Sequence, residues 1–396
     1  MVTHYPFWYK LHSLVFDRLG FMRVLYFYKT YYPDSLGGIE QFINQLARAT
    51  HKLGIQSDVL ALSDNPSSQT LTIDGHTVHQ VKKNIQIAST GFSLSAFAKF
   101  ASLAKTADLI HYNFPWPFMD IVHFATQVKK PTVVTYHSDI VKQQTLLKFY
   151  KPLQKQFLTR ANRIIATSPN YLETSPVLKA YRHKTSVIPI GLDKSIYPTP
   201  SAEKLNRWQN ALPARFFLFI GVFRYYKGLH ILLDALKKTD YPTVIIGSGP
   251  MEEELKKQAS HLKLQNIYFL GTLADEDKVA LLQLCFALVF PSHLRSEAFG
   301  ISLLEGAMYG KPMISCEIGT GTSFININGE TGLVIESNNT AALEHAMQTL
   351  WNEETLAKKM GELAEKRYWE LFTADHMAKQ YSVLYKQVID SANSYL

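Results

Sequence analysis

Two glutamates, Glu297 and Glu305, stand eight residues apart in the stretch R-S-E-A-F-G-I-S-L-L-E. The apolar residues 301–309 predict a helix that begins after Gly300, with Glu305 about one turn into it. The first N–H groups of a helix have no partner within it and can hold phosphate or sugar oxygens. A carboxylate at each end of such a site can bind hydroxyl groups, which suits a sugar nucleotide. Taken alone, the spacing also fits two solvated glutamates on a helix edge.

Two cations, Arg224 and Lys227, lie in a glycine-bounded loop after the predicted strand 216–220. Fixed cations offset the charge of a diphosphate, so this loop is a candidate site for a charged leaving group, although surface cations are also common. His137 follows the predicted strand 131–136, at the end where open α/β sheets bind ligands. A buried core histidine is the alternative, and the polar Ser and Asp that follow argue against it.

Strands and helices must alternate to position these residues, and the chain shows this alternation from residue 23 to residue 389. Alternation of this kind, with right-handed connections, predicts two doubly wound α/β halves with parallel sheets. The loops after parallel strands gather at one edge of a sheet, where ligands bind. Glycine turns fall in several of these loops, at Gly37, Gly38, Gly221, Gly247 and Gly249.

In this order, the motifs resemble the retaining glycosyltransferases of family 4, which have the GT-B fold. E-x-F-G-x4-E is the signature of that family, and I-P-I-G-L-D at 188–193 and G-E-T-G-L-V at 329–334 match other family runs. The resemblance covers residues 23–389. One departure is that Arg224 and Lys227 stand closer together than the corresponding family residues.

The resemblance implies an α/β GT-B architecture, in which two Rossmann-like doubly wound domains face each other across a cleft and a C-terminal helix crosses back to the first domain. We expect an N-terminal extension over 1–21, an acceptor-side domain over 22–193, a nucleotide-sugar-binding domain over 194–372 and the returning helix within 373–396. Because Met22 directly precedes the first predicted strand, either the protein starts there or residues 1–21 form a loose surface helix, with a poorly ordered tail as the general expectation for a terminus.

The resemblance also implies a role for each candidate residue. Glu305 is expected to bind ribose hydroxyls and Glu297 the hydroxyls of the donor sugar. Arg224 and Lys227 are expected to neutralise the leaving diphosphate, and His137 to lie near the anomeric carbon. Backbone N–H groups and glycine turns are expected to hold donor oxygens, at Phe299, Gly300, Leu303, Gly37, Gly38, Gly221, Gly247 and Gly249. No D-x-D metal motif stands in a suitable place, so transfer without metal or cofactor is expected.

Two segments, F-Y-K-T-Y-Y-P-D-S-L-G-G-I-E-Q and E-I-G-T-G-T-S-F-I-N, are most similar to bacterial O-antigen and polysaccharide mannosyl- or rhamnosyltransferases. This similarity implies a GDP-sugar donor, mannose first, and a polyprenyl-diphosphate-linked glycan acceptor in O-antigen or surface polysaccharide synthesis. A UDP-hexose donor stays open. So does a catalytically idle protein of the same fold that binds nucleotide-sugars, although the intact glutamates and cations favour an enzyme.

The net charge of +8 is unevenly distributed. Residues 1–193 contain 21 Lys and Arg against 11 Asp and Glu, a balance of +10, whereas residues 194–396 contain 20 against 22. No nucleic-acid-binding motif is present, so an anionic membrane surface is the expected partner. Without an apolar run of about 18 residues, no helix is expected to span a bilayer, and two cysteines fit a reducing cytoplasm. We therefore expect a cytoplasmic protein on the inner membrane face. The candidate contacts are Lys142, Lys148, Lys151, Lys155, Trp116 and Phe118, the last two in a loop over 112–118 expected to be exposed.

Overall fold

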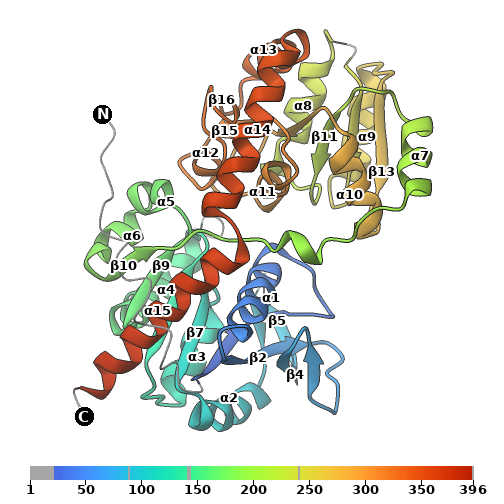
Figure 1. Cartoon of the computed structure of the whole chain (residues 1–396). Coiled ribbons are helices and arrows are strands. Elements are labelled where there is room, and N and C mark those ends of the chain that lie inside the picture. Colours follow the sequence, from blue (N-terminus) through green and yellow to red (C-terminus); the bar gives the residue numbers. More distant parts are fainter. Residues whose placement is uncertain (1–21, 88–89, 141–143, 240, 395–396) are drawn as a thin grey trace. The chain divides into compact units, whose positions relative to one another are not determined.

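The chain contains two main sheets with connecting helices (Figure 1). The computed structural model describes residues 22–87, 90–140, 144–239 and 241–394. The expected N-terminal extension and Lys142 lie outside the described residues.

The chain divides into two compact units. One contains the chain up to Val134, Arg160–Asn162 and the chain from Ala378, and the other contains Thr135–Thr159 and Arg163–Met377. The domain limits expected from the sequence stay a prediction.

The first sheet has eight strands in the order β10-β9-β8-β7-β1-β2-β4-β3. β1 pairs in parallel with β2 and β7, while β3 and β4 pair antiparallel on either side of Asp74-Gly75. Almost every side chain of β1 is buried, as expected for a central strand of a parallel sheet. The strands are β1 (Met22–Tyr28), β2 (Ile55–Ser63), β3 (Leu71–Ile73), β4 (His76–Lys82), β7 (Leu109–Phe114), β8 (Thr132–Tyr136), β9 (Arg163–Ala166) and β10 (Thr185–Val187).

Helices connect these strands, and one helix returns from the end of the chain. The connecting helices are α1 (Gly38–His51), α2 (Ser95–Thr106), α3 (Pro117–Ala125), α4 (Gln144–Arg160), α5 (Pro169–Thr174) and α6 (Pro176–Ala180). α15 (Ala374–Asn393, red in Figure 1) belongs to the first unit from Ala378 onward. There the hydroxyl of Tyr385 lies 3.1 Å from the hydroxyl of Tyr26 and 2.6 Å from Nδ1 of His111. The expected returning helix is therefore confirmed.

The aromatic stretch 112–118 is buried, so the expectation of an exposed loop is wrong. β7 continues to Phe114 and α3 begins at Pro117. Trp116 and Phe118 are 1% and 3% exposed. The ring of Trp116 packs on Phe27 of β1 with ring centres 4.8 Å apart. A small hairpin, β5 (Ile85–Ile87) and β6 (Thr90–Phe92), adds to the cover: the indole N–H of Trp116 donates to the carbonyl of Gly91 at 3.3 Å, and the ring of Phe118 packs on Phe92. Burying two large aromatic surfaces outweighs the turn preference of the flanking prolines.

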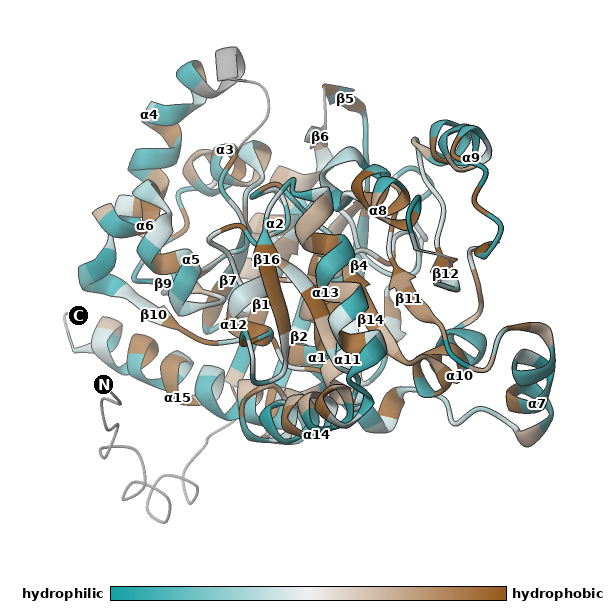
Figure 2. Cartoon of the chain, turned by 90° about the horizontal axis from the view of Figure 1, so that it is seen from above, coloured by the Kyte–Doolittle hydropathy of each residue, from teal (hydrophilic) through white to brown (hydrophobic). Residues whose placement is uncertain are grey.

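The second sheet has six parallel strands in the order β13-β12-β11-β14-β15-β16. The central strands β11 and β14 are buried along their whole length, and β11 is coloured toward the hydrophobic end of the scale in Figure 2. The strands are β11 (Phe217–Ile220), β12 (Thr243–Ile246), β13 (Ile267–Gly271), β14 (Ala287–Phe290), β15 (Met313–Glu317) and β16 (Gly332–Glu336). The helices around them are α8 (Leu229–Leu236), α9 (Glu252–His261), α10 (Asp275–Leu284), α11 (Ile301–Met308), α12 (Thr322–Ile325), α13 (Thr340–Asn352) and α14 (Glu354–Leu371).

A further helix, α7 (Ala202–Ala211), has no counterpart in the sequence prediction. Its sequence is polar with few apolar residues, and it is mainly hydrophilic in Figure 2. Trp208 is its one fully buried residue, and its indole N–H donates to the carboxylate of Asp277 at 2.9 Å. This polar contact holds α7 on α10.

Candidate active site

The two glutamates flank the start of α11, in the second unit. Glu297 lies in the loop after β14 and Glu305 within α11. Both are buried, with exposures of 9% and 3%. A buried carboxylate needs partners, because removing a charge from water is costly. Neither glutamate is therefore a solvated residue on a helix edge.

The first turn of α11 is fixed against the sheet. Gly300 has φ of 102°, a left-handed conformation that glycine adopts without strain. The hydroxyl of Ser302 donates to the carbonyl of Ile220 at 2.9 Å, which ties this turn to the end of β11. Phe299 and Leu303 are buried on either side of the turn. The unpaired N–H groups of the turn, that of Leu303 among them, thus lie at the carboxyl edge of the second sheet.

Glu297 forms an ion pair with Lys227. The ammonium nitrogen of Lys227 lies 2.5 Å from Oε2 of Glu297, and the hydroxyl of Ser292 donates to the same oxygen at 3.3 Å. The ammonium also lies 4.9 Å from the centre of the Phe290 ring. Burial opposes the charge on Lys227, but the Glu297 carboxylate more than offsets it, so the pKa of Lys227 is raised. The structure therefore brings together one candidate cation and one candidate carboxylate.

The loop that carries Lys227 is packed against two neighbouring turns. Gly228 follows the short 3-10 helix η4 (Tyr225–Lys227) with φ of 71°, and a Cβ there would lie 2.0 Å from the carbonyl oxygen of Pro291. A Cβ on Gly247 would lie 2.0 Å from the carbonyl oxygen of Gly221. These glycines thus allow close approach of backbones. The predicted contact of Gly221, Gly247 and Gly249 with the donor stays a prediction.

Arg224 stands apart from this packing. It precedes η4, its side chain is exposed, and no described residue forms an ion pair with it. Burial raises the pKa of Tyr226, and the Glu297 carboxylate raises that of Lys227 against burial; the nearby Arg224 charge opposes each increase to a smaller extent. An exposed cation beside a buried one can reach a ligand without breaking an existing contact.

Glu305 has two partners that the sequence did not indicate. Its Oε1 accepts from the hydroxyl of Tyr197 at 3.0 Å and from the ammonium of Lys278 at 3.1 Å. Burial opposes the charge on Lys278, but the carboxylates of Glu305 and Asp275 raise its pKa well above the ordinary value. Burial and the Glu305 charge also raise the pKa of Tyr309 to about 12. No local pattern could have found Tyr197, which lies 108 residues from Glu305.

Each glutamate keeps one oxygen without a hydrogen bond. In the described part of the chain, Oε1 of Glu297 and Oε2 of Glu305 have no donor within reach, whereas the other oxygen of each is engaged. A carboxylate held by one oxygen is fixed in orientation and can still accept a hydroxyl through the other. The geometry suits two hydroxyl-binding sites separated by a helix N-terminus.

His137 follows β8, as predicted, and belongs to the second unit. It is 5% exposed, so the expectation that the polar Ser138 and Asp139 keep this histidine from burial is wrong. Burial lowers its pKa to about 3. The imidazole is therefore neutral at physiological pH. A neutral ring can donate one hydrogen bond and accept another, but it supplies no positive charge to a diphosphate.

Gly37 and Gly38 lie at the N-terminus of α1 in the first unit. A Cβ on Gly37 would lie 2.5 Å from Oε2 of Glu40, and the Glu40 carboxylate accepts hydrogen bonds from the hydroxyls of Thr30 and Ser35. Gly37 thus makes room for a buried carboxylate that the sequence did not single out. The predicted contact of both glycines with a donor stays a prediction.

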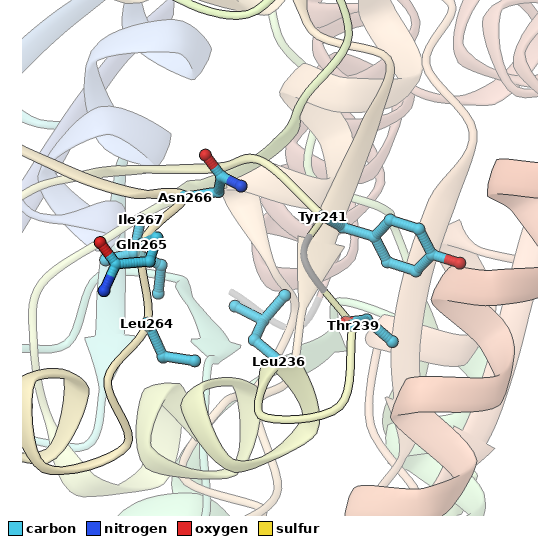
Figure 3. Close-up of a pocket in the computed structure, with 7 residues that line it drawn as sticks. All are labelled: Leu236, Thr239, Tyr241, Leu264, Gln265, Asn266 and Ile267. Atoms are coloured by element: carbon cyan, nitrogen blue, oxygen red, sulfur yellow. The ribbon is translucent and has the colours of Figure 1, made fainter.

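The described residues offer no metal-binding cluster, and they contain a small pocket. No group of three or more His, Cys, Asp or Glu side chains among them could hold a metal ion. A small pocket lies near the start of β12 and β13 (Figure 3). This is the amino end of these parallel strands, whereas Glu297 follows the carboxyl end of β14. It is lined by Leu236, Thr239, Tyr241, Leu264, Gln265, Asn266 and Ile267. Its lining holds no charged side chain, so it is separate from the candidate active site.

Comparison with protein families and curated proteins gives consistent matches. The family model described as "Glycosyltransferase Family 4" matches residues 36–195, and the model described as "Glycosyl transferases group 1" matches residues 202–367. The chain is 60% identical over 353 residues to D-rhamnosyltransferase WbpZ of Pseudomonas aeruginosa, covering 89% of this chain and 93% of that protein. It is 50% identical over 370 residues to O-antigen chain mannosyltransferase C of Escherichia coli, covering 93% of this chain and 100% of that protein.

Solved structures share the architecture at lower identity. Sucrose-phosphate synthase from Thermosynechococcus elongatus superposes with a TM-score of 0.76 at 22% identity, covering 93% of this chain and 100% of that one. HepE of Anabaena in complex with UDP gives a TM-score of 0.74 at 19% identity, covering 92% and 100%. At such identities the likeness shows the fold alone, that of two Rossmann-like domains.

Proposed function

The chain belongs to glycosyltransferase family 4 and has the GT-B fold, and from this premise we propose that it transfers a hexose, mannose in first place, from a GDP-sugar to a lipid-linked glycan. The name of the relative at 50% identity supports a role in O-antigen synthesis. D-rhamnose is the second candidate sugar, because the relative at 60% identity is named for it. A UDP-hexose donor is the further alternative.

The observation that carries this proposal is the pair of buried glutamates around the N-terminus of α11, each with one oxygen engaged by a lysine. Oε2 of Glu305 would accept from the ribose hydroxyls, and Oε1 of Glu297 from hydroxyls of the donor sugar. The N–H groups of Phe299, Gly300 and Leu303 would hold sugar and phosphate oxygens between them.

The proposed reaction retains the configuration at the anomeric carbon. The bond from that carbon to the diphosphate breaks while the acceptor hydroxyl attacks from the same face. The leaving phosphate takes the proton of that hydroxyl, so the products are the lengthened glycan and a nucleoside diphosphate. Lys227 and Arg224 would stabilise the charge that grows on the diphosphate. His137, neutral at physiological pH, would hydrogen-bond to the sugar.

A donor screen tests the proposal. The purified protein is incubated with GDP-mannose, GDP-D-rhamnose, UDP-glucose and UDP-galactose, and release of nucleoside diphosphate is measured with the anomeric form of the sugar product by NMR. Fastest turnover of GDP-mannose with retention supports the first candidate. Preference for a UDP-hexose favours the alternative donor, an inverted product contradicts the retaining mechanism, and turnover of none favours an idle protein.

We also propose that the reaction needs no metal ion. The cations Arg224 and Lys227 would take the role that a divalent metal has at a D-x-D site. Full turnover in EDTA is the expected result. Loss of turnover in EDTA that Mg²⁺ restores would contradict this part of the proposal.

The acceptor is proposed to be a polyprenyl-diphosphate-linked glycan, which requires the protein to reach the cytoplasmic membrane face. No helix among the described residues has the length and apolar character to cross a bilayer. Trp116 and Phe118 cannot insert into lipid, because both are buried. The helix α4 offers a different surface: Lys148, Lys151 and Lys155 are exposed on it, and Phe149 is 82% exposed. An amphipathic helix of this kind suits an anionic headgroup layer.

Vesicle binding tests this surface. We expect binding to vesicles with anionic lipids that weakens as salt rises, since each lysine near the surface contributes about 1 kcal/mol. Changing Lys148, Lys151 and Lys155 to glutamate should abolish it. The matched control changes Lys257, Lys358 and Lys359, which are exposed on α9 and α14, to glutamate. If both triple variants lose vesicle binding equally, net charge and not the α4 surface determines binding. Equal binding to neutral and anionic vesicles would contradict electrostatic docking.

A further inference from the structure

One ion pair joins the two loops that carry His137 and Glu297. Arg295 lies two residues before Glu297, and Asp139 lies two residues after His137. Nη2 of Arg295 is 3.3 Å from Oδ2 of Asp139, with side-chain exposures of 32% and 18%. Both residues belong to the second unit. The contact therefore links the two loops side chain to side chain, although 156 residues separate them in the sequence.

Asp139 is held from several directions. Its Oδ1 accepts from the hydroxyl of Tyr136 at 2.9 Å and from the hydroxyl of Ser175 at 2.7 Å. Its backbone N–H donates to the hydroxyl of Tyr171 at 2.6 Å. Tyr136 ends β8 and Ser175 caps α6, so the carboxylate is fixed to the end of a strand and the start of a helix. Only Oδ2 is left to face Arg295.

Arg295 also has several contacts besides Asp139. Its Nη1 donates to the hydroxyl of Thr174 at 3.0 Å and to the carbonyl of Gly319 at 2.8 Å, and its guanidinium lies 5.1 Å from the centre of the Tyr171 ring. A planar guanidinium can make these bonds at once, in fixed directions, which a lysine cannot do. The Glu297 loop is thereby tied to α5 and to the turn after β15.

We propose that Arg295 and Asp139 are positioning residues that fix Glu297 and His137 for reaction on the same donor sugar. The inference rests on the proposed function, because it needs both residues at that sugar. Neither Arg295 nor Asp139 is assigned contact with the substrate. Their effect is on the orientation of two neighbouring groups, and a displacement of about 1 Å at a reacting centre can cost on the order of a hundredfold in rate.

The variants Arg295→Lys and Asp139→Asn test the pair with little change in volume. Arg295→Lys keeps the charge and removes the fork, while Asp139→Asn keeps the shape and removes the charge. We expect kcat to fall about tenfold or more in each. The Kd for nucleoside diphosphate, which depends on Glu305 on the other side of the helix start, should change less than about twofold. The double variant should be no slower than the slower single variant, because both remove one interaction.

The matched control is the ion pair between Arg182 and Glu173, at 2.6 Å with exposures of 61% and 53%. Arg182→Lys and Glu173→Gln should leave kcat, Kd and the melting temperature unchanged. Asp139→Glu keeps the charge and changes the packing. A kcat restored in this variant would show that the ion pair matters for positioning and that the packing does not.

A kcat within about twofold of wild type in both variants would overturn the inference. So would losses in kcat that multiply in the double variant. A loss of kcat that only follows a loss of folded protein in thermal denaturation would also overturn it. Failure of the proposed function is distinguishable, because then Glu297→Gln and His137→Ala would keep full activity as well.

Discussion

Two carboxylate–lysine pairs stand on either side of the α11 start, and they differ in what surrounds them. Lys227 comes from a short turn between two glycines, next to the exposed Arg224, and its Glu297 has one further donor, Ser292. Lys278 comes from the regular helix α10, where Asp275 is a second anionic partner, and its Glu305 is also held by Tyr197.

The Lys227–Glu297 pair is therefore suited to a ligand whose charge changes during the reaction, and the Lys278–Glu305 pair to a ligand contact that stays the same. Around Lys227 there is one anion and two cations, so a diphosphate adds the charge that is missing. Around Lys278 there are two carboxylates, which more than balance its single charge. We infer that the first pair acts in the chemical step and the second holds Glu305 in place for the nucleotide.

Loss of Lys227 is expected to have the largest effect. In Lys227→Ala the nearly buried Glu297 loses its cation, which costs about 3–5 kcal/mol of stability in comparable sites. Turnover should fall on the order of 10²–10³-fold. Nucleotide affinity should change much less, because the diphosphate gains charge only as the bond breaks. Turnover, calorimetry and thermal denaturation measure the three effects.

A second variant separates the fold from the chemistry. The double change Lys227→Met and Glu297→Gln removes both charges and should recover most of the stability but none of the turnover. Arg224→Ala should lower turnover without loss of stability, because Arg224 is exposed. Near wild-type turnover in both Lys227→Ala and Arg224→Ala would mean that neither cation acts in the chemical step.

Loss of Glu305 should act on binding instead. Charge-assisted hydrogen bonds to ribose hydroxyls contribute about 1.5–3 kcal/mol each, so Glu305→Ala should weaken nucleotide binding at least about tenfold. The fold should persist, because Lys278 keeps Asp275 as a partner. Calorimetry with GDP and UDP measures the affinity. The exposed Glu362 on α14 provides the matched alanine control. Unchanged affinity would refute the ribose assignment.

Loss of Lys278 is expected to give a smaller change in the same direction. Lys278→Met keeps the length of the side chain, and Glu305 keeps the hydroxyl of Tyr197. The lost interaction contributes about 1 kcal/mol, so nucleotide binding should weaken about fivefold. Turnover at saturating donor should stay near wild type. A drop in turnover as large as that of Lys227→Ala would remove the distinction between the two pairs.

The sequence predicted what depends on local periodicity. Buried runs such as F-L-F-I of β11 and the helix after Gly300 are visible as patterns, and so is the last helix of the chain. The two glutamates could be found because their spacing along one helix start is local. Their position at the carboxyl edge of the sheet follows from the order of strands and helices along the chain.

The partners of the glutamates could not be found in this way. Tyr197 and Lys278 meet Glu305 only in the folded chain, from segments 108 and 27 residues away. The same limit explains the error at Trp116 and Phe118, whose burial depends on the distant hairpin of β5 and β6. A local pattern shows that an aromatic residue is present and does not show what covers it.

The smallest expected effect is on the pH dependence of stability, and it comes from His137. It tests whether this histidine is the neutral member of a site that also contains two charged pairs. Its folded pKa is lowered to about 3 by burial, from an ordinary value of 6.5. Below pH 6.5 the unfolded chain therefore binds a proton that the folded chain does not, so stability is complete above that pH and is lost as the pH falls toward 3. Between pH 7 and pH 6 the loss from this residue is about 0.7 kcal/mol.

Urea denaturation at both pH values measures this loss, and His137→Gln should lack it. His76 and His123, whose pKa values burial lowers to about 4, titrate in the same window. The argument therefore uses the difference in slope between wild type and variant, and not the slope itself. His183→Gln, at an exposed position, is the matched control. An identical pH dependence in wild type and His137→Gln would mean that His137 is not held neutral in the folded protein, and its assignment as an uncharged contact of the sugar would then fail while those of Glu297 and Lys227 stand.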